Sequence, residues 1–197
     1  MLLCYNIPSF GVKYMLKNED ILDEKDKRLR LTSKEVTFPL TNEDKKAIEL
    51  ITEYLTNSQI DKLAKKYNLR PGMGMAAIQL GIPKRYLVIV HEQEIKETFK
   101  TYVIINPKII SNSEEKIYVE EGEGCLSVNR DVEGIVPRYA RVTISGYDTE
   151  GNQIKIRARE ELAIAFQHEI DHLNGILFYD HIDPKNPYKG ENIYRAI

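Results

Sequence analysis

The sequence EELAIAFQHEIDHLNG, residues 160–175, carries the pattern from which the fold is predicted. Its apolar residues recur at the spacing of one helix face, which is the pattern of an amphipathic helix: Leu162, Ala165, Phe166, Ile170 and Leu173. The stretch closes on Asn174 and Gly175, and glycine readily adopts the left-handed conformation that ends many helices. We therefore predict a helix over residues 160–174.

The same helix carries the motif H-E-x-x-H at residues 168–172. Residues at i and i+4 share a helix face, so the imidazoles of His168 and His172 can reach one metal ion. Glu169 can then take a proton from a water that the ion acidifies. Two surface histidines on an amphipathic helix are the plainer reading, but the chain has only 4 histidines and this pair flanks a glutamate. The segment predicts a hydrolytic metal site.

A catalytic metal usually needs a third protein ligand, and the downstream sequence offers none that is convincing. Phe178 occupies the position of the third histidine in metzincins and cannot bind metal. Glu191 lies where thermolysin-like enzymes have a glutamate, but no helical pattern brings it back to the site. His181 and Asp183 are better read as parts of a polar loop.

Upstream, Cys125 lies in the segment EGCLS at residues 123–127. A thiolate is a good ligand for zinc or ferrous iron. A lone cysteine is equally well read as a small buried residue. A cysteine nucleophile with His168 or His172 as its base is also open, although it leaves Glu169 without a clear role.

A third segment, GMGMAAIQ at residues 72–79, consists of small and apolar residues and one amide. It lacks the lysine and hydroxyl of a phosphate-binding loop. Small residues let a backbone approach a ligand closely, and the Gln79 amide can donate to a developing oxyanion. A tight turn packed on the core explains the segment equally well.

The remaining pattern predicts an α+β domain. Thr41 begins a helix, with Asp44 as capping-box partner, that we expect to continue to about residue 68. Apolar runs predict strands at residues 85–91, 116–119 and 102–105, the last closed by Asn106 and Pro107. Residues 141–147 and 153–159 alternate around a turn and predict a hairpin.

Composition excludes several classes of protein. The chain has 197 residues, of which 42% are hydrophobic, so one core in a single domain is expected. The net charge of −2 gives no global basic field, and we predict no direct nucleic-acid contact. No apolar stretch predicts a membrane span, and the first residues do not read as a signal peptide. Cys4 and Cys125 are read as reduced thiols of a cytoplasmic protein.

Together the three segments resemble peptide deformylase. That family carries G-x-G-x-A-A-x-Q, E-G-C-L-S and H-E-x-D-H in this order, and the chain matches at residues 72–79, 123–127 and 168–172. The similarity spans roughly residues 20–183. Residues 123–138 and 167–182 are similar to the type 2 branch, found mainly in Gram-positive bacteria and relatives such as mycoplasmas. The resemblance implies antiparallel sheets around a central metal-binding helix.

The resemblance also implies an activity: hydrolysis of the N-formyl group from N-formylmethionine of nascent polypeptides, with release of formate. The metal ligands would be Cys125, His168 and His172, and one divalent ion would be bound, usually Fe²⁺, which Zn²⁺, Ni²⁺ or Co²⁺ can replace. Glu169 would act as general base and then general acid. Gln79 and the backbone N–H of Leu126 would help polarise the formyl oxygen.

Further residues follow from the same resemblance. The Gly74 backbone would hold the substrate extended, and Met73 and Ile164 would border the methionine pocket. Arg138 would pair with Glu123 and so brace the Cys125 loop. Residues 1–18 have no clear counterpart and are read as an N-terminal extension of a single catalytic domain, residues 19–197. The chain lacks the long C-terminal helix by which type 1 members reach the ribosome, so at most a transient ribosome proximity is expected.

Two competing functions are weighed against this one. An H-E-x-x-H zinc endopeptidase would need a downstream ligand, and none is convincing. A non-catalytic peptide-binding relative would be expected to have lost a catalytic group, yet Glu169 and Gln79 are both present.

Overall fold

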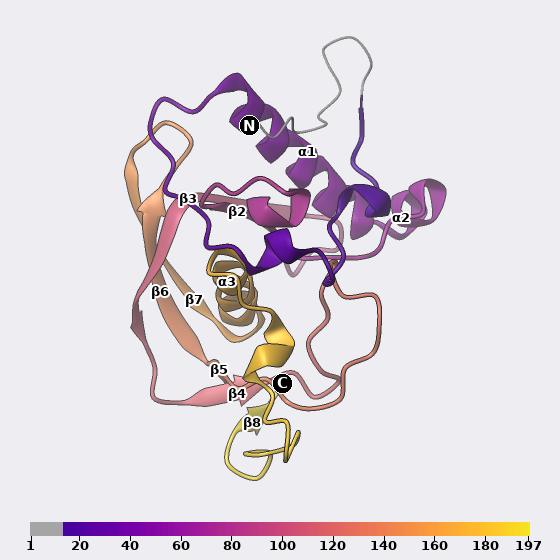
Figure 1. The fold of residues 1–197 in the computed structure, drawn as a ribbon, viewed down its shortest axis with the longest axis vertical. Helices are drawn as coiled ribbons and strands as arrows, with labels where there is room; N and C mark the ends of the chain where they lie inside the picture. Colours follow the sequence, from indigo (N-terminus) through magenta and orange to yellow (C-terminus); the bar gives the residue numbers. More distant parts are fainter. Residues whose placement is uncertain (1–13) are drawn as a thin grey trace.

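A five-stranded antiparallel sheet organises the computed structural model, which describes residues 14–197. The strand order is β1-β2-β3-β6-β7, and every neighbouring pair is antiparallel. The strands are β1 Gly74–Ala76, β2 Tyr86–Glu92, β3 Phe99–Asn112, β6 Arg141–Tyr147 and β7 Gln153–Arg159. Helix α3 (Glu160–Leu173) lies near the centre of the molecule, beside this sheet (Figure 1). The expected α+β architecture around a central helix is confirmed.

A smaller, three-stranded sheet contacts α3 through its strand β5. It has the order β5-β4-β8, formed by β5 Arg138–Tyr139, β4 Lys116–Tyr118 and β8 Arg195–Ala196. The pair β4–β8 is parallel, and β8 brings the end of the chain back beside the middle of the sequence. The side chain of Gln167 on α3 holds β5 in place by accepting from the Tyr139 N–H (2.9 Å) and donating to the Tyr139 carbonyl (2.9 Å).

The first strands of the large sheet are covered on both faces. In β2, Tyr86, Val88 and Val90 pack in one apolar cluster with helix α1 (Asn42–Ser58). The alternate residues, Leu87 and Ile89, pack in a second cluster with α3. A strand buried on both faces needs a continuous apolar run rather than alternation, and residues 86–90 have one.

The hairpin β6–β7 is covered on one face only. Val142 and Ile144 are buried in the cluster with α3, whereas Arg141 and its register partner Arg159 are exposed. This alternation is the sequence pattern that predicted the hairpin at residues 141–147 and 153–159. Both strands occupy those bounds.

The helix expected from Thr41 to about residue 68 is two helices. The predicted capping box of Thr41 and Asp44 is present and starts α1, but α1 ends at Ser58, and α2 (Asp61–Tyr67) follows after a break. At the break, the Gln59 amide donates to the backbone carbonyls of Gly72 (3.1 Å) and Val90 (2.8 Å). Helical periodicity cannot reveal these long-range bonds, and they favour a chain that turns here.

Strand β3 is also longer than predicted, since it passes through Asn106 and Pro107. The register with β6 shifts between Ile105 and Lys108, as at a β-bulge, where proline is tolerated. Asn106 has a positive φ of 53°, and its side chain exchanges two hydrogen bonds with the backbone of Val36 (2.8 and 2.9 Å). The residues read as a strand end therefore form a bend within one strand.

The segment that follows residue 13 contacts several distant parts of the chain. Leu16 is buried in the cluster with α1. The N–H of Leu22 donates to the Gln79 carbonyl (2.8 Å), and that of Glu24 to the Ser127 carbonyl (2.7 Å). Residues 1–13, with Cys4 and most of the expected extension, lie outside the described residues. Within residues 14–197, no helix is long and apolar enough to cross a membrane.

Candidate metal centre and active site

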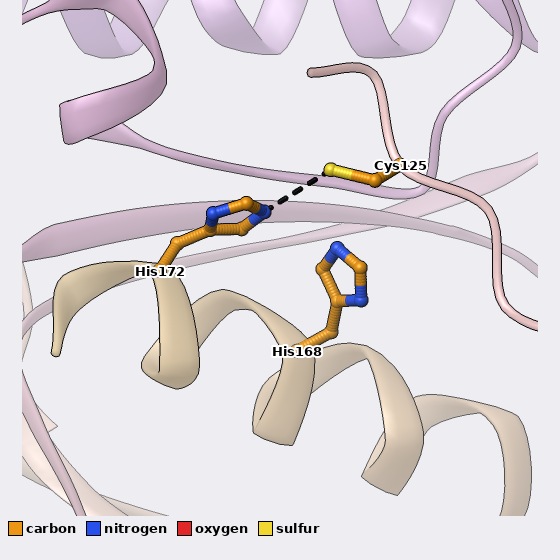
Figure 2. Close-up of side chains that lie close together, drawn as sticks. All are labelled: Cys125, His168 and His172. Carbon is orange, nitrogen blue, oxygen red and sulfur yellow. Dashed lines mark hydrogen bonds between the residues drawn. The ribbon is translucent and has the colours of Figure 1, made fainter. Parts of the chain in front are cut away.

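Three potential metal ligands converge from two parts of the chain. His168 and His172 project from successive turns of α3, and Cys125 reaches them from a loop (Figure 2). One ligand atom from each lies within 4.8 Å of the others, and Cys125 Sγ is 3.2 Å from His172 Nε2. A thiolate with two imidazoles is a donor set suited to Zn²⁺ or Fe²⁺. The residues therefore fit a divalent metal ion.

The orientation of His168 is set by a buried carboxylate. Its Nδ1 lies 2.9 Å from Glu123 Oε2, which leaves Nε2 for the metal. Arg138 pairs with both oxygens of Glu123 (2.7 and 3.0 Å) and also contacts Asp171, as expected for the pairing of Arg138 with Glu123. Burial alone would raise the pKa of the Glu123 carboxyl, but Arg138 and His168 hold that pKa at about 2. Glu123 therefore stays an acceptor beside the ligand.

Glu169, the residue after His168 on α3, has a buried carboxyl group. Its Oε2 has no hydrogen-bond partner among the described residues, although the atom is buried. Burial raises the pKa of the Glu169 carboxyl to about 7, against the opposing charge of His168. A carboxyl that titrates near neutrality can both accept and return a proton.

Gly74 is required by the position of that carboxyl. A Cβ built on Gly74 would lie 2.5 Å from Glu169 Oε1 and 2.8 Å from its Cγ, closer than real contacts allow. The absence of a side chain lets β1 pass directly over Glu169. Strand β1 is also an edge of the large sheet, with β2 as its one partner within the described chain.

Gln79 lies on a 3₁₀ turn, Ala77–Leu80, directly after β1. Its Oε1 accepts from the Ala76 N–H (2.9 Å), which fixes the amide so that Nε2 is the donor facing the Cys125 loop. Nε2 lies 3.2 Å from Ser127 Oγ and 3.8 Å from Cys125 Sγ. The Ser127 N–H also points to that sulfur, at 3.4 Å. The thiol therefore lies among polar donors.

A cleft of about 430 Å³ opens onto these groups. The predicted substrate-contacting residues Met73, Gly74 and Ile164 all line it, together with Gln79, Glu123, Cys125, Leu126, His168 and Glu169. Ile164 lies one turn before His168 on α3 and is 6% exposed. The structure thus brings every predicted site residue to one cleft or, for His172 and Arg138, into contact with a residue that lines it.

The downstream residues that were weighed as a third ligand do not belong to the cluster of Cys125, His168 and His172 in the described chain. Phe178 stacks on His168, with ring centroids 6.0 Å apart, and contributes packing. His181 Nε2 lies 2.7 Å from Asp171 Oδ2, which occupies that ring nitrogen. Asp183 pairs with Lys189, and Glu191 is exposed. The zinc endopeptidase reading, which needed one of these ligands, therefore has no support.

Sequence reasoning missed two residues of the site's surroundings. Asp171, inside the histidine motif, links Arg138 to His181, and its place between the two histidines was a usable signal. Arg70 places its guanidinium against the Cys125 loop. Its contacts cross 55 residues of sequence or more, so no local pattern could have indicated them.

Comparisons with known proteins agree with this geometry. The family model described as "Polypeptide deformylase" matches residues 18–188. A peptide deformylase of Listeria monocytogenes is 50% identical over 88% of this chain and 94% of its own, and "Peptide deformylase 2" of Bacillus anthracis is 46% identical over the same shares. The crystal structure of peptide deformylase from Ehrlichia chaffeensis is 32% identical with a TM-score of 0.69, over 87% of this chain and 90% of that one. The chain belongs to the polypeptide deformylase family.

Proposed function

We propose that this chain hydrolyses the formyl group from N-formylmethionine at the start of new polypeptides, releasing formate. The observation that carries the proposal is the meeting of Cys125, His168 and His172 with Glu169 and Gln79 at one cleft. Family membership points to the same reaction, since the relatives are named peptide deformylases.

Cys125, His168 and His172 would hold the metal ion, with Fe²⁺ as the proposed ion in the cell and Zn²⁺, Ni²⁺ or Co²⁺ as substitutes. A divalent ion there supplies Lewis-acid polarisation of the formyl carbonyl and acidifies water. The thiolate favours ions softer than Mg²⁺ or Ca²⁺. Glu123 keeps His168 oriented for this role by its hydrogen bond to Nδ1.

Glu169 is proposed as the proton carrier of the reaction. It takes a proton from the attacking water as the oxygen bonds to the formyl carbon. It then returns the proton to the amide nitrogen as the C–N bond breaks, which gives the free amine and formic acid, and the acid releases its remaining proton to become formate. The Gln79 amide and the Leu126 N–H would stabilise the oxyanion that forms between these steps.

The substrate is proposed to bind as an added strand. Because β1 is an edge strand and Gly74 lines the cleft, an extended peptide can pair with its backbone. The methionine side chain would then lie against Ile164 and Met73. A nascent chain presents such a flexible N-terminus, and we place the enzyme in the cytoplasm, transiently near ribosomes. Residues 19–197 would form the catalytic domain, and residues 1–18 an extension outside it.

The test is formate release from a formyl-Met-Ala peptide, with protein loaded anaerobically with Fe²⁺ or aerobically with Ni²⁺. We expect turnover of this peptide and none of acetyl-Met-Ala, because an acetyl methyl group crowds a site built for a formyl hydrogen. A folded, metal-loaded protein that releases no formate would overturn the proposal. Cleavage of internal peptide bonds in an unformylated peptide would instead favour an endopeptidase.

A further inference from the structure

The guanidinium of Arg70 is directed at a run of backbone carbonyls. Its Nη2 donates to the carbonyls of Cys125 (3.0 Å) and Val128 (3.0 Å), and its Nη1 to that of Leu126 (3.1 Å) and to the Asn129 side chain. Within residues 14–197 no carboxylate forms an ion pair with it. An arginine fork that binds several carbonyls of one short loop fixes the conformation of that loop.

The bonds from Arg70 to these carbonyls also fix the directions of the neighbouring backbone N–H groups. In a trans peptide unit the C=O and the following N–H point in opposite directions. The bond from Arg70 to the Cys125 carbonyl therefore directs the Leu126 N–H away from Arg70. The bond to the Leu126 carbonyl does the same for the Ser127 N–H, which points at Cys125 Sγ from 3.4 Å.

The backbone of Arg70 is itself held in place. Its N–H donates to Asn18 Oδ1 (3.1 Å), and its carbonyl accepts from the Tyr54 hydroxyl (3.2 Å). Two residues later, a Cβ on Gly72 would lie 2.7 Å from Leu126 Cδ1, so this segment and the Cys125 loop are in close contact. The guanidinium thus extends from a backbone that is held in place in the segment between α2 and β1.

We propose that Arg70 is a positioning residue that aims two backbone N–H groups, that of Leu126 at the substrate oxyanion and that of Ser127 at the Cys125 sulfur. The part concerning Leu126 rests on the proposed deformylation, whereas the part concerning Ser127 concerns the metal–thiolate bond alone. Arg70 does not touch the reacting atoms; it sets the direction of groups that do.

The variants are Arg70→Gln and Arg70→Lys. Gln cannot span three carbonyls, and Lys keeps the charge but replaces the planar fork with a point donor. Misdirecting one oxyanion donor should lower kcat about 10- to 100-fold, somewhat less than removing it. KM should change little, because the substrate strand still pairs with β1. Arg70→Lys should recover only part of the loss.

The matched control is Arg157→Gln, which removes an exposed arginine on β7 away from the cleft. All proteins are loaded with Co²⁺, and the thiolate-to-cobalt charge-transfer absorption is recorded beside kcat and KM. We expect Arg70→Gln to shift that absorption, because the N–H···S bond to the ligand is weakened, and Arg157→Gln to leave it unchanged. Circular dichroism and the thermal midpoint establish that each variant is folded.

The outcomes separate the proposals. A folded Arg70→Gln protein with unchanged absorption and kcat would overturn the positioning role. A rise in KM with kcat unchanged would also overturn it, because that result indicates a direct contact with substrate. If Arg70→Gln is unfolded, Arg70→Lys decides: its absorption and kcat must then differ from those of the wild type, and unchanged values would overturn the positioning role. If the wild type releases no formate but its cobalt absorption still shifts on Arg70→Gln, the proposed function fails while the thiolate part of the Arg70 proposal stands.

Discussion

Helices α1 and α3 cover opposite faces of one sheet, yet they bury different kinds of side chain. The buried face of α1 is mostly apolar, formed by Ala47, Ile48, Leu50, Ile51, Tyr54 and Leu55. Helix α3 has a comparable apolar face towards the sheet, and it also buries the polar side chains of Gln167, His168, Glu169 and His172. Buried polar groups destabilise a fold unless they are partnered.

The two helices differ in whether their buried polar groups have hydrogen-bond partners. The buried polar residues of α1, Asp44 and Ser58, bond to nearby groups, namely Thr41, Lys84 and the Leu55 carbonyl. On α3, two buried atoms, Glu169 Oε2 and His172 Nδ1, have no partner within the described chain. We infer from this difference that α1 serves mainly stability, whereas α3 keeps polar groups available at some cost in stability. Changes to the two helices should therefore separate folding from activity.

The largest effect is expected on α3, from Glu169→Gln. Loss of the proton carrier should lower kcat by about 10²- to 10⁴-fold, the usual contribution of general acid–base catalysis. Metal content, measured by atomic absorption, should stay unchanged, and Glu49→Gln on the exposed face of α1 is the control. Retention of more than about a tenth of the wild-type rate would remove Glu169 from this role.

The corresponding change on α1 is Ile51→Ala. Ile51 is 0% exposed, and truncation of such a side chain leaves a cavity that costs about 2–5 kcal/mol in the free energy of unfolding. Urea unfolding measures that loss, with exposed Lys45→Ala on the same helix as control. The kcat per folded molecule should be that of the wild type. A proportionate fall in kcat would mean that α1 is coupled to the chemistry and that the contrast between the helices is wrong.

A smaller effect is expected from Glu123→Gln, on the Cys125 loop beside His168. The uncharged amide holds His168 less firmly and leaves Arg138 with a weaker partner, so metal affinity should fall about 10- to 100-fold. Competition with a chelator measures this affinity. Glu115→Gln, which disturbs the exposed pairs with Arg141 and Arg195, is the matched control and should leave affinity unchanged. Equal affinities in the two variants would count against an orienting role for Glu123.

The smallest effect is expected at the start of α1, from Thr41→Ala. The Thr41 side chain accepts from the Asp44 N–H (3.2 Å), and loss of such a cap costs about 1 kcal/mol. Thr52→Ala, within the helix, is the comparison for removal of a hydroxyl. The thermal midpoint should fall only in the first variant, with no change in kcat in either. An unchanged midpoint for Thr41→Ala would show that packing alone holds the helix start.

Sequence alone determined the features that depend on neighbours along the chain. The spacing of His168 and His172, the capping box at Thr41 and the alternation of the β6–β7 hairpin all follow from local geometry, and all three are present. The joint presence of three motifs also indicated the family correctly, because their order is specific even where each motif is weak. Residue spacing could not choose between Cys125 as ligand and Cys125 as a buried thiol.

The tertiary structure settles the features that depend on contacts between distant segments. It broke the first helix at Gln59, through bonds to Gly72 and Val90, and it carried β3 through Pro107. It also brought Cys125 to His172 across 47 residues and set Arg70 against the Cys125 loop. Such contacts depend on how the whole chain closes on its core, and no periodicity within one segment records them.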